Sequence, residues 1–269
     1  MNIPHTDSVQ SQIHASAAIY PSLKGKVVFL TGGATGIGEA MVRAFSRQAA
    51  KVAFVDIDID AGTRLATELA GESAAREVLF KPCDVTDAVA LQAVIAEVAQ
   101  ALGSIGVLVN NAANDLRHAP DQVTPEFFDR AVAVNLRHQF FAAQAVAPGM
   151  AAVGGGSIIN LGSISWMNKG AGFPVYATCK AAVQGLTRSL ARDLGKSGIR
   201  VNTLVPGWVM TDKQLRLWVK PESEHEIDAA QCLPGRLQAE DIAAMALFLA
   251  ADDSRMCTAQ DFIVDAGWT

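Results

Sequence analysis

The stretch Lys26-Val-Val-Phe-Leu-Thr-Gly-Gly-Ala-Thr-Gly-Ile-Gly38 decides the fold. Residues 26–31 are mostly β-branched or apolar and predict a strand buried on both faces. A glycine-rich loop follows at once, and residues 37–49 then repeat apolar side chains at helical spacing. Such a loop between a strand and a helix can be a plain turn. It is also where a dinucleotide-binding fold brings backbone and helix N-terminus against a pyrophosphate.

The alternation of strands and helices continues to the end of the chain. Helices are expected near 61–70, 88–102, 125–150 and 175–195, and further strands at 51–56, 77–80, 107–110, 157–161, 199–205 and 261–264. Apolar strands separated by helices indicate a parallel sheet covered on both faces. The sequence therefore predicts one α/β domain over residues 20–269, a Rossmann fold whose doubly wound sheet has about seven strands.

Composition excludes several classes of protein. Of 269 residues, half are hydrophobic and 18% are charged, and the net charge is −5, which argues against a nucleic-acid or anionic-membrane surface. The four cysteines lie far apart without metal-ligand spacing, as in a reducing compartment. Residues 1–19 lack the basic start and apolar block of a signal peptide and are expected to form a flexible tail. We expect a cytoplasmic protein without a metal site.

Asp56 supplies a second cofactor signal. It ends the second predicted strand, eighteen residues after Gly38, where a carboxylate can accept both ribose hydroxyls of adenosine and repel a 2′-phosphate. The glycine-rich loop holds no lysine or arginine, so we expect NAD as cofactor, with NADP use left open. The plainer alternative is that Asp56, Asp58 and Asp60 form a polar loop and a helix cap.

Tyr176 and Lys180 suggest acid–base chemistry. Four residues apart on a helix they share a face, so the ammonium group would favour the phenolate and lower the tyrosine pKa. Such a tyrosine can take a hydroxyl proton while hydride leaves to a nicotinamide. Ser163, just after the strand 157–161, would hydrogen-bond the same substrate oxygen. A surface tyrosine beside an unrelated lysine is the alternative.

Taken together, these motifs resemble the classical short-chain dehydrogenase/reductase family from about Tyr20 to the end of the chain. The matching segments, in order, are Thr31–Gly38, Cys83-Asp84-Val85, Asn110-Asn111-Ala112, Asn135, Ser163, Tyr176 with Lys180, and Pro206-Gly207 with Thr211. Ala113 departs from the family, which usually has glycine there. Alanine would cost about 1 kcal/mol if that position required positive φ.

The resemblance implies roles for these residues. Tyr176 would be the general acid/base, Lys180 would lower its pKa and bind the nicotinamide ribose, and Ser163 would position the reacting oxygen. Asn135 would hold a relay water, although it could also be a satisfied core amide, and Asp84 could be an ordinary cap. The cofactor set expected from motif and resemblance is Gly32, Gly36, Ile37, Gly38, Asp56, Ile57, Asp84, Val85, Asn111, Tyr176, Lys180, Pro206, Val209 and Thr211.

A closer resemblance is to bacterial aldose 1-dehydrogenases of this family, which oxidise C1 of sugars such as L-arabinose, D-galactose or D-xylose to the aldonolactone. It includes Asn-Asn-Ala-Ala-Asn-Asp-Leu-Arg-His118, Ala-Ala-Gln-Cys-Leu-Pro-Gly-Arg236 and Val-Asp-Ala-Gly-Trp268. A sugar needs short polar groups and a flat apolar surface. The substrate residues expected on these grounds are Asn114, Ser163, Trp166, Asn168 and Trp208, with Asp115 beside them. The tryptophans could equally serve loop packing, and the amides could be turn-formers.

Two further expectations concern access to the substrate and the assembly of the protein. A lid over the substrate is expected at about 208–233, and a homotetramer is expected through the helices 125–150 and 175–195. Two other functions stay open: reduction of a 3-oxoacyl or other lipophilic ketone, and a non-catalytic NAD-binding scaffold. The first predicts a more apolar substrate site, and the second predicts loss of Ser163, Tyr176 or Lys180.

Overall fold

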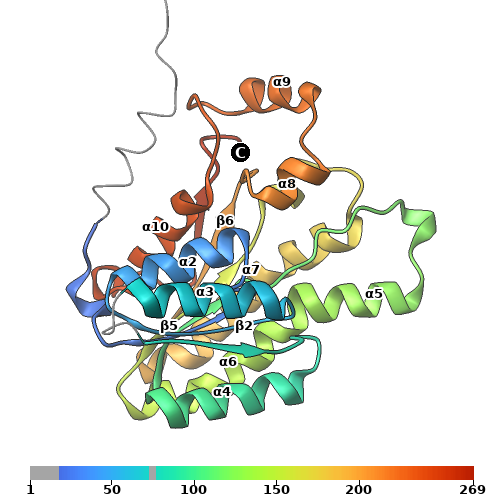
Figure 1. Ribbon diagram of the computed structural model, residues 1–269. Helices are drawn as coiled ribbons and strands as arrows, with labels where there is room; N and C mark the ends of the chain where they lie inside the picture. The colour runs from blue at the N-terminus through green and yellow to red at the C-terminus, as the bar shows by residue number, and fades with distance from the viewer. Residues whose placement is uncertain (1–17, 73–76) are drawn as a thin grey trace, which may run out of the picture.

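A seven-stranded, entirely parallel sheet forms the centre of the computed structural model, which describes residues 18–72 and 77–269 (Figure 1). The strand order is β3-β2-β1-β4-β5-β6-β7, so the chain winds first to one side of β1 and then to the other. The strands are β1 (Val27–Thr31), β2 (Lys51–Asp56), β3 (Val78–Pro82), β4 (Ile105–Asn110), β5 (Gly156–Leu161), β6 (Ile199–Pro206) and β7 (Asp261–Val264). The predicted fold class is confirmed, with strand ends shifted by one or two residues. Most of the expected tail, residues 1–17, lies outside the described residues.

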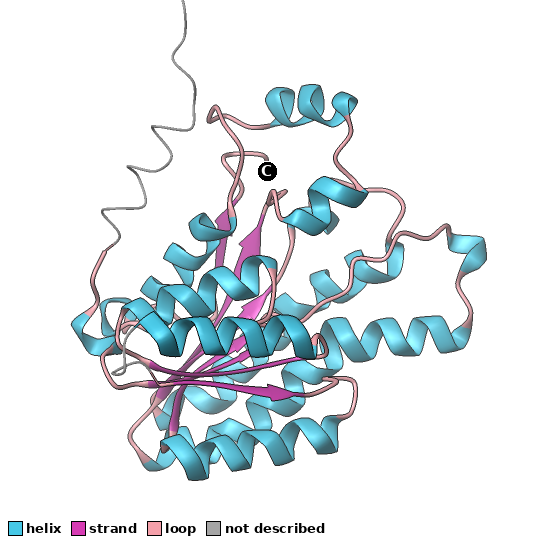
Figure 2. Cartoon of the chain, viewed as in Figure 1, coloured by secondary structure: helices cyan, strands magenta, loops and turns pink. Residues whose placement is uncertain are grey.

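Helices cover both faces of the sheet (Figure 2). One apolar core lies beneath α2, α3 and α10, and a second lies beneath α4, α6 and α7. Among the described residues no helix is both long and apolar enough to span a bilayer. The α-helices are α2 (Gly36–Arg47), α3 (Ile59–Glu72), α4 (Ala88–Leu102), α5 (Pro125–Val132), α6 (His138–Ala152), α7 (Pro174–Leu194), α8 (Asp212–Leu217), α9 (Pro221–Ala230) and α10 (Ala239–Ala250).

The helix predicted over residues 125–150 changes its hydrogen-bonding pattern partway along. A π-helical segment, η4 (Ala133–Arg137), separates α5 from α6. The Asn135 side chain donates to the carbonyl oxygen of Ala131 at 3.0 Å and so competes with the backbone for that acceptor. Apolar periodicity could not reveal this interruption, because it depends on one polar side chain. Such π-turns are often found at functional sites.

A row of buried polar side chains fixes α7 against the sheet. The strand register aligns Asn110 of β4 with Asn160 of β5, and Asn160 with Thr203 of β6. The Asn110 amide donates to Asn160 at 2.8 Å, and Asn160 donates to the Thr187 hydroxyl of α7 at 3.0 Å. The Thr203 hydroxyl donates to the same Thr187 hydroxyl at 3.0 Å. Because these groups are buried, sliding α7 would leave polar atoms unpaired, so the helix has one favoured position.

Candidate active site

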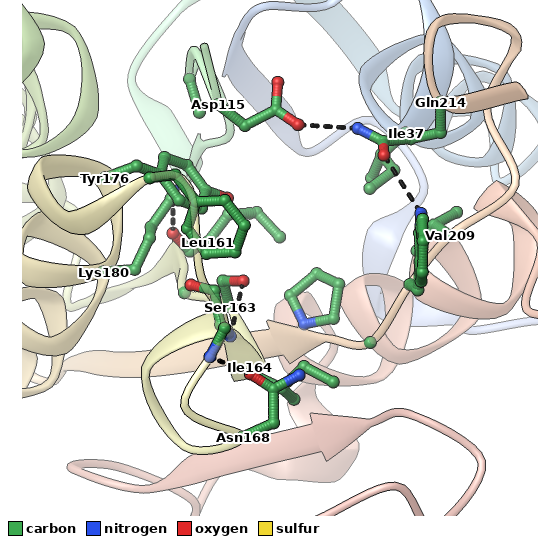
Figure 3. Close-up of a pocket in the computed structure, with 18 of the residues that line it drawn as sticks. Ile37, Asp115, Leu161, Ser163, Ile164, Asn168, Tyr176, Lys180, Val209 and Gln214 are labelled. Atoms are coloured by element: carbon green, nitrogen blue, oxygen red, sulfur yellow. Dashed lines mark hydrogen bonds between the residues drawn. The ribbon is translucent and has the colours of Figure 1, made fainter. Parts of the chain in front are cut away.

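Two cavities adjoin at the carboxyl ends of the strands. The larger, of about 980 Å³, runs along the glycine-rich loop and the ends of β2 and β3. The smaller, of about 400 Å³, lies between the β5 end, the start of α7 and the segment after β6 (Figure 3). Ile37, Asn111, Tyr176 and Thr211 line both cavities. Tyr176 therefore stands where the two spaces meet.

The glycine-rich loop is packed too closely for side chains at Gly32, Gly33 and Gly38. A Cβ on Gly38 would lie 1.8 Å from the carbonyl oxygen of Gly32, and Gly32 itself has φ +68. The loop rests on the end of β4: the Thr31 hydroxyl accepts from the Asn111 backbone N–H at 3.0 Å, and the Asn111 amide donates to Gly32 at 2.7 Å. The loop thus leaves backbone and helix N-terminus facing the larger cavity, which fits a dinucleotide pyrophosphate.

Asp56 lines the larger cavity and also supports its wall. Its carboxylate oxygens accept from the backbone N–H groups of Ala34 at 2.9 Å and Asp58 at 3.1 Å. The helix-cap alternative holds for Asp58, which accepts from the Ala61 N–H at the start of α3 at 2.9 Å. The cation Arg64 of α3 also lines this cavity, although it is not among the predicted cofactor residues.

The residues predicted to contact the cofactor all line one of the two cavities. Those along the larger cavity are Gly32, Gly36, Ile37, Gly38, Asp56, Ile57, Asp84, Val85, Asn111, Tyr176 and Thr211. Those at the junction or in the smaller cavity include Lys180, Pro206 and Val209. Their actual contacts with a cofactor stay predictions.

Lys180 is buried, and its Nζ donates to the carbonyl oxygen of Leu161 at 2.7 Å (Figure 3). The same Nζ lies 5.6 Å from the centre of the Tyr176 ring. Ser163 follows Leu161 by two residues and accepts from the Ser165 backbone N–H at 3.1 Å. The β5 end and the first turns of α7 thus bring Ser163, Tyr176 and Lys180 to the same cavity.

The pKa of Tyr176 differs from the sequence expectation. Removal of the phenolate from water raises the Tyr176 pKa, the negative charge of Asp115 adds to this, and Ser163 and Arg117 act in the opposite direction. Burial lowers the pKa of Lys180 to about 8. The expected lowering of the tyrosine pKa by Lys180 therefore does not outweigh burial, and the protein's own groups favour the neutral phenol.

Two residues with alternative interpretations serve the local structure. The Asn135 amide is fully paired: its oxygen accepts from the Asn114 N–H at 2.8 Å, and its nitrogen donates to the carbonyl oxygens of Asn114 and Ala131. Asp84 accepts from the Thr86 N–H at 2.9 Å while also lining the larger cavity. The side chain of Asn135 thus holds the loop after β4 on the π-segment, and the relay water assigned to it stays a prediction. Ala113 is not among the positive-φ residues, so its departure from glycine is harmless.

The smaller cavity contains only part of the predicted substrate set. Ser163, Asn168 and Trp208 line it, whereas Asn114 lines the larger cavity. Trp166 lines neither of these two cavities and is 36% exposed. Asp115, expected beside the substrate residues, also lines the smaller cavity. Further residues of this cavity that were not predicted for the substrate are Arg117, Phe173, Gln214, Glu226 and Trp268.

Hydrogen bonds join three side chains that line this cavity. Asp115 accepts from the Gln214 amide at 2.7 Å, and Gln214 accepts from the Trp208 indole at 3.1 Å (Figure 3). Trp208 and Trp268 have ring centres 6.3 Å apart. Trp268 reaches the cavity because Asp265 accepts from the N–H groups of Gly267 and Thr269 and so turns the chain after β7. Only the folded chain end could reveal this contact.

Comparison with known proteins identifies the family. A family model described as enoyl-(acyl carrier protein) reductase matches residues 32–269. The D-xylose 1-dehydrogenase of Caulobacter vibrioides is 49% identical over 94% of this chain and 99% of its own length. The probable galactose dehydrogenase GalD of Rhizobium meliloti is 45% identical over 92% of this chain and 96% of its own. The chain belongs to the short-chain dehydrogenase/reductase family.

Solved structures agree with this assignment. A 7α-hydroxysteroid dehydrogenase complexed with NADH and 7-oxo glycochenodeoxycholic acid superposes with a TM-score of 0.87 at 32% identity, over 93% of this chain and 96% of the other. A blue fluorescent protein from a metagenomic library, in complex with NADPH, gives a TM-score of 0.84 at 35% identity, over 92% and 99%. The chain is an oxidoreductase that binds NAD(P).

The low pKa of Lys180 predicts a pH-dependent stability. Lys180 loses its proton near pH 8 in the folded protein and near 10.5 when unfolded. Between these values the unfolded chain binds more protons, so the free energy of unfolding should rise with pH. Relative to Lys180→Met, the wild type should gain stability from about pH 8 to 10.5 and not below about pH 7. Urea denaturation across this range measures it.

The exposed Lys196 gives the matched control, because Lys196→Met should follow the wild-type pH profile. A stability difference between wild type and Lys180→Met that does not change with pH would contradict the buried, low-pKa ammonium.

Proposed function

We propose that this enzyme oxidises a free aldopyranose at C1 to the aldonolactone, with NAD(P) as hydride acceptor. The observation that carries the proposal is the smaller cavity: Asp115, Arg117, Asn168 and Gln214 surround a space bounded by two tryptophans, beside Tyr176. Polar groups for hydroxyls and flat rings for C–H faces suit a sugar. The similarity to a D-xylose 1-dehydrogenase and a probable galactose dehydrogenase over almost the whole chain supports it.

The reaction removes a hydride from C1 and a proton from the hydroxyl oxygen bound to C1. When bound, the oxidised nicotinamide accepts the C1 hydride and contributes a positive charge. Ser163 would hold the C1 oxygen, and the Tyr176 oxygen would take its proton as the C1–O double bond forms. Because the protein's own groups raise the Tyr176 pKa, a further positive charge in the adjoining cavity is needed to favour the phenolate. Lys180, held by Leu161, would keep its ammonium beside the tyrosine and reach toward the nicotinamide ribose.

For the cofactor we propose a preference for NAD over NADP. The Asp56 carboxylate would accept the adenosine ribose hydroxyls and repel a 2′-phosphate. Its bonds to Ala34 and Asp58 fix it in place beforehand. Arg64 in the same cavity offsets part of this repulsion, so NADP use is reduced rather than abolished.

The alternative of a lipophilic ketone or 3-oxoacyl substrate has one supporting observation, the description of the matching family model. The charged and amide groups that line the smaller cavity disfavour it, because burying them against an acyl chain would leave them unpaired. The non-catalytic alternative requires loss of Ser163, Tyr176 or Lys180, and all three line the cavity.

Residues 208–233, with α8 and α9, would form a lid over the sugar. Both helices lie beyond the carboxyl end of β6 (Figure 1), and Lys213 of α8 pairs with Asp115 at 2.6 Å. Opening this segment would admit the sugar, and the pairing with Asp115 would hold it closed. We also propose a cytoplasmic location, which the four free thiols support.

Replacing Tyr176 with phenylalanine tests the mechanism. Tyr176→Phe should lower kcat by about 10²- to 10⁴-fold, because the proton acceptor is lost. NAD binding, measured by titration of tryptophan fluorescence, should be unchanged. Tyr20, the other tyrosine of the chain, gives the control: Tyr20→Phe should keep wild-type kcat. Turnover that survived in Tyr176→Phe would contradict the assignment.

The substrate class is tested by initial rates on D-xylose, L-arabinose, D-galactose, L-fucose and D-glucose, each with NAD and with NADP. One stereochemical set should turn over fast, with L-arabinose and D-galactose behaving alike, and NAD should be the better cofactor. If no aldose is oxidised although NAD binds, the sugar proposal fails and ketone substrates should be tested next.

We further propose a homotetramer joined through α5, α6 and α7. Phe128 and Phe140 are more than 40% exposed on α5 and α6, and a groove between α6 and α7 is lined by Phe140, Leu190 and Leu194. Light scattering after size-exclusion chromatography should give four times the chain mass. A monomer mass that persists at micromolar concentration would contradict this assembly.

A further inference from the structure

Arg117 is a half-buried cation in the wall of the smaller cavity. The carbon at the centre of its guanidinium lies 4.1 Å from the centre of the Phe173 ring and 5.0 Å from the centre of the Trp218 ring. Its Nε is buried and has no hydrogen-bond partner among the described residues. A buried donor of this kind is costly unless something accepts from it. The aromatic contacts stabilise the charge but do not satisfy the N–H groups.

The backbone that carries Arg117 is held firmly. The N–H of His118 donates to the carbonyl oxygen of Gly172 at 2.7 Å, and the Asn114 backbone is held on both sides by the Asn135 amide. The loop between β4 and α5 is thereby tied to the start of α7, which carries Tyr176. A cation fixed in this way is preorganised and loses little entropy when a ligand binds.

The chemistry around Arg117 specifies what it binds. Contacts of the guanidinium face with two rings leave its in-plane N–H groups to donate, and these form a fork that matches two adjacent oxygens. Asp115, two residues earlier on the same loop, provides carboxylate oxygens, and it is one of the charges nearest to Arg117. Two neighbouring hydroxyls can accept from the N–H groups of the guanidinium and donate their own hydrogens to the carboxylate. A carboxylate or phosphate ligand would be repelled by Asp115 and Glu226, which line the same cavity.

We propose that Arg117 binds a pair of adjacent ring hydroxyls of the sugar, other than the reacting C1 hydroxyl, and thereby determines which aldose is oxidised. The proposal rests on the sugar 1-dehydrogenase function proposed above and deepens it. Asp115 accepts from the same hydroxyls while its bonds to Lys213 and Gln214 of α8 hold it in place. Arg117 thus selects sugars by the configuration of these ring hydroxyls, while Tyr176 and Ser163 act at C1.

The test asks whether the effect of Arg117→Met on kcat/KM depends on which hydroxyls the sugar carries. Wild type and variant are assayed on the preferred aldose and on its 2-, 3- and 4-deoxy derivatives. On the parent sugar, Arg117→Met should lose about 10- to 100-fold in kcat/KM, mainly through KM, as expected for hydrogen bonds to a charged group. On the deoxy sugar that lacks a bound hydroxyl, wild type should already be poor, and the substitution should cost little more.

A structural role would give a different pattern. If Arg117 only packs the lid, the variant should lose the same factor on the parent and on every deoxy sugar, and that result would overturn the proposal. So would an unchanged kcat/KM in Arg117→Met, or a wild-type preference for a hexuronate over the neutral hexose. Arg255→Met, at an exposed arginine outside both cavities, is the control and should match wild type.

The outcome is separable from failure of the proposed function. A wild-type enzyme that oxidises no aldose contradicts the sugar proposal itself. If the wild type oxidises an aldose and Arg117→Met discriminates among the deoxy sugars as the wild type does, only the role of Arg117 is contradicted.

Discussion

The hydrogen bond from the buried Lys180 ammonium to the carbonyl oxygen of Leu161 is the contact on which the site depends. It joins α7 to the end of β5, one helical turn after Tyr176 and two residues before Ser163. An ammonium group is costly to bury, and this acceptor offsets part of that cost while fixing the helix. The polar row through Asn160 and Thr187 holds the same helix farther along. Together these contacts place the phenol where the larger cavity meets the smaller one.

In the proposed mechanism, the charges around Tyr176 make the reaction depend on both cavities being filled. Burial and Asp115 favour the neutral phenol, and Lys180 is itself held with a lowered pKa. In the proposed mechanism, an oxidised nicotinamide supplies the missing positive charge at the moment when the tyrosine must accept a proton. Asp115 also connects the two cavities. Lys213 of the larger cavity and Gln214 of the smaller cavity both donate to the Asp115 carboxylate. Helix α8 is therefore held by Asp115, a residue of the loop between β4 and α5.

Much of the fold could be predicted from the sequence, because strands buried on both faces are apolar throughout and the glycine-rich loop marks where the first one ends. The sequence also placed Gly32, Gly38 and Asp56 at the ends of the first two strands, where they line the larger cavity, and their contacts with a cofactor stay predictions. The π-turn at Asn135 could not be predicted, because the hydrogen bonds of one polar side chain leave no apolar pattern in the sequence. Trp268 and Arg117 line the smaller cavity because of tertiary contacts, which produce no periodic pattern in the sequence. The Tyr176 pKa was misjudged because the motif shows the neighbouring lysine and hides both burial and Asp115.

The central claim, that hydride leaves C1 of a neutral sugar beside Tyr176, is tested most directly by isotope transfer. D-xylose and D-galactose carrying deuterium at C1 are oxidised by the enzyme, and the reduced nicotinamide is analysed by mass spectrometry. The account predicts one deuterium in each reduced cofactor formed, with aldonolactone as the first product. Reduced cofactor without deuterium, formed at a comparable rate, would show that the hydride comes from another carbon and would contradict the account.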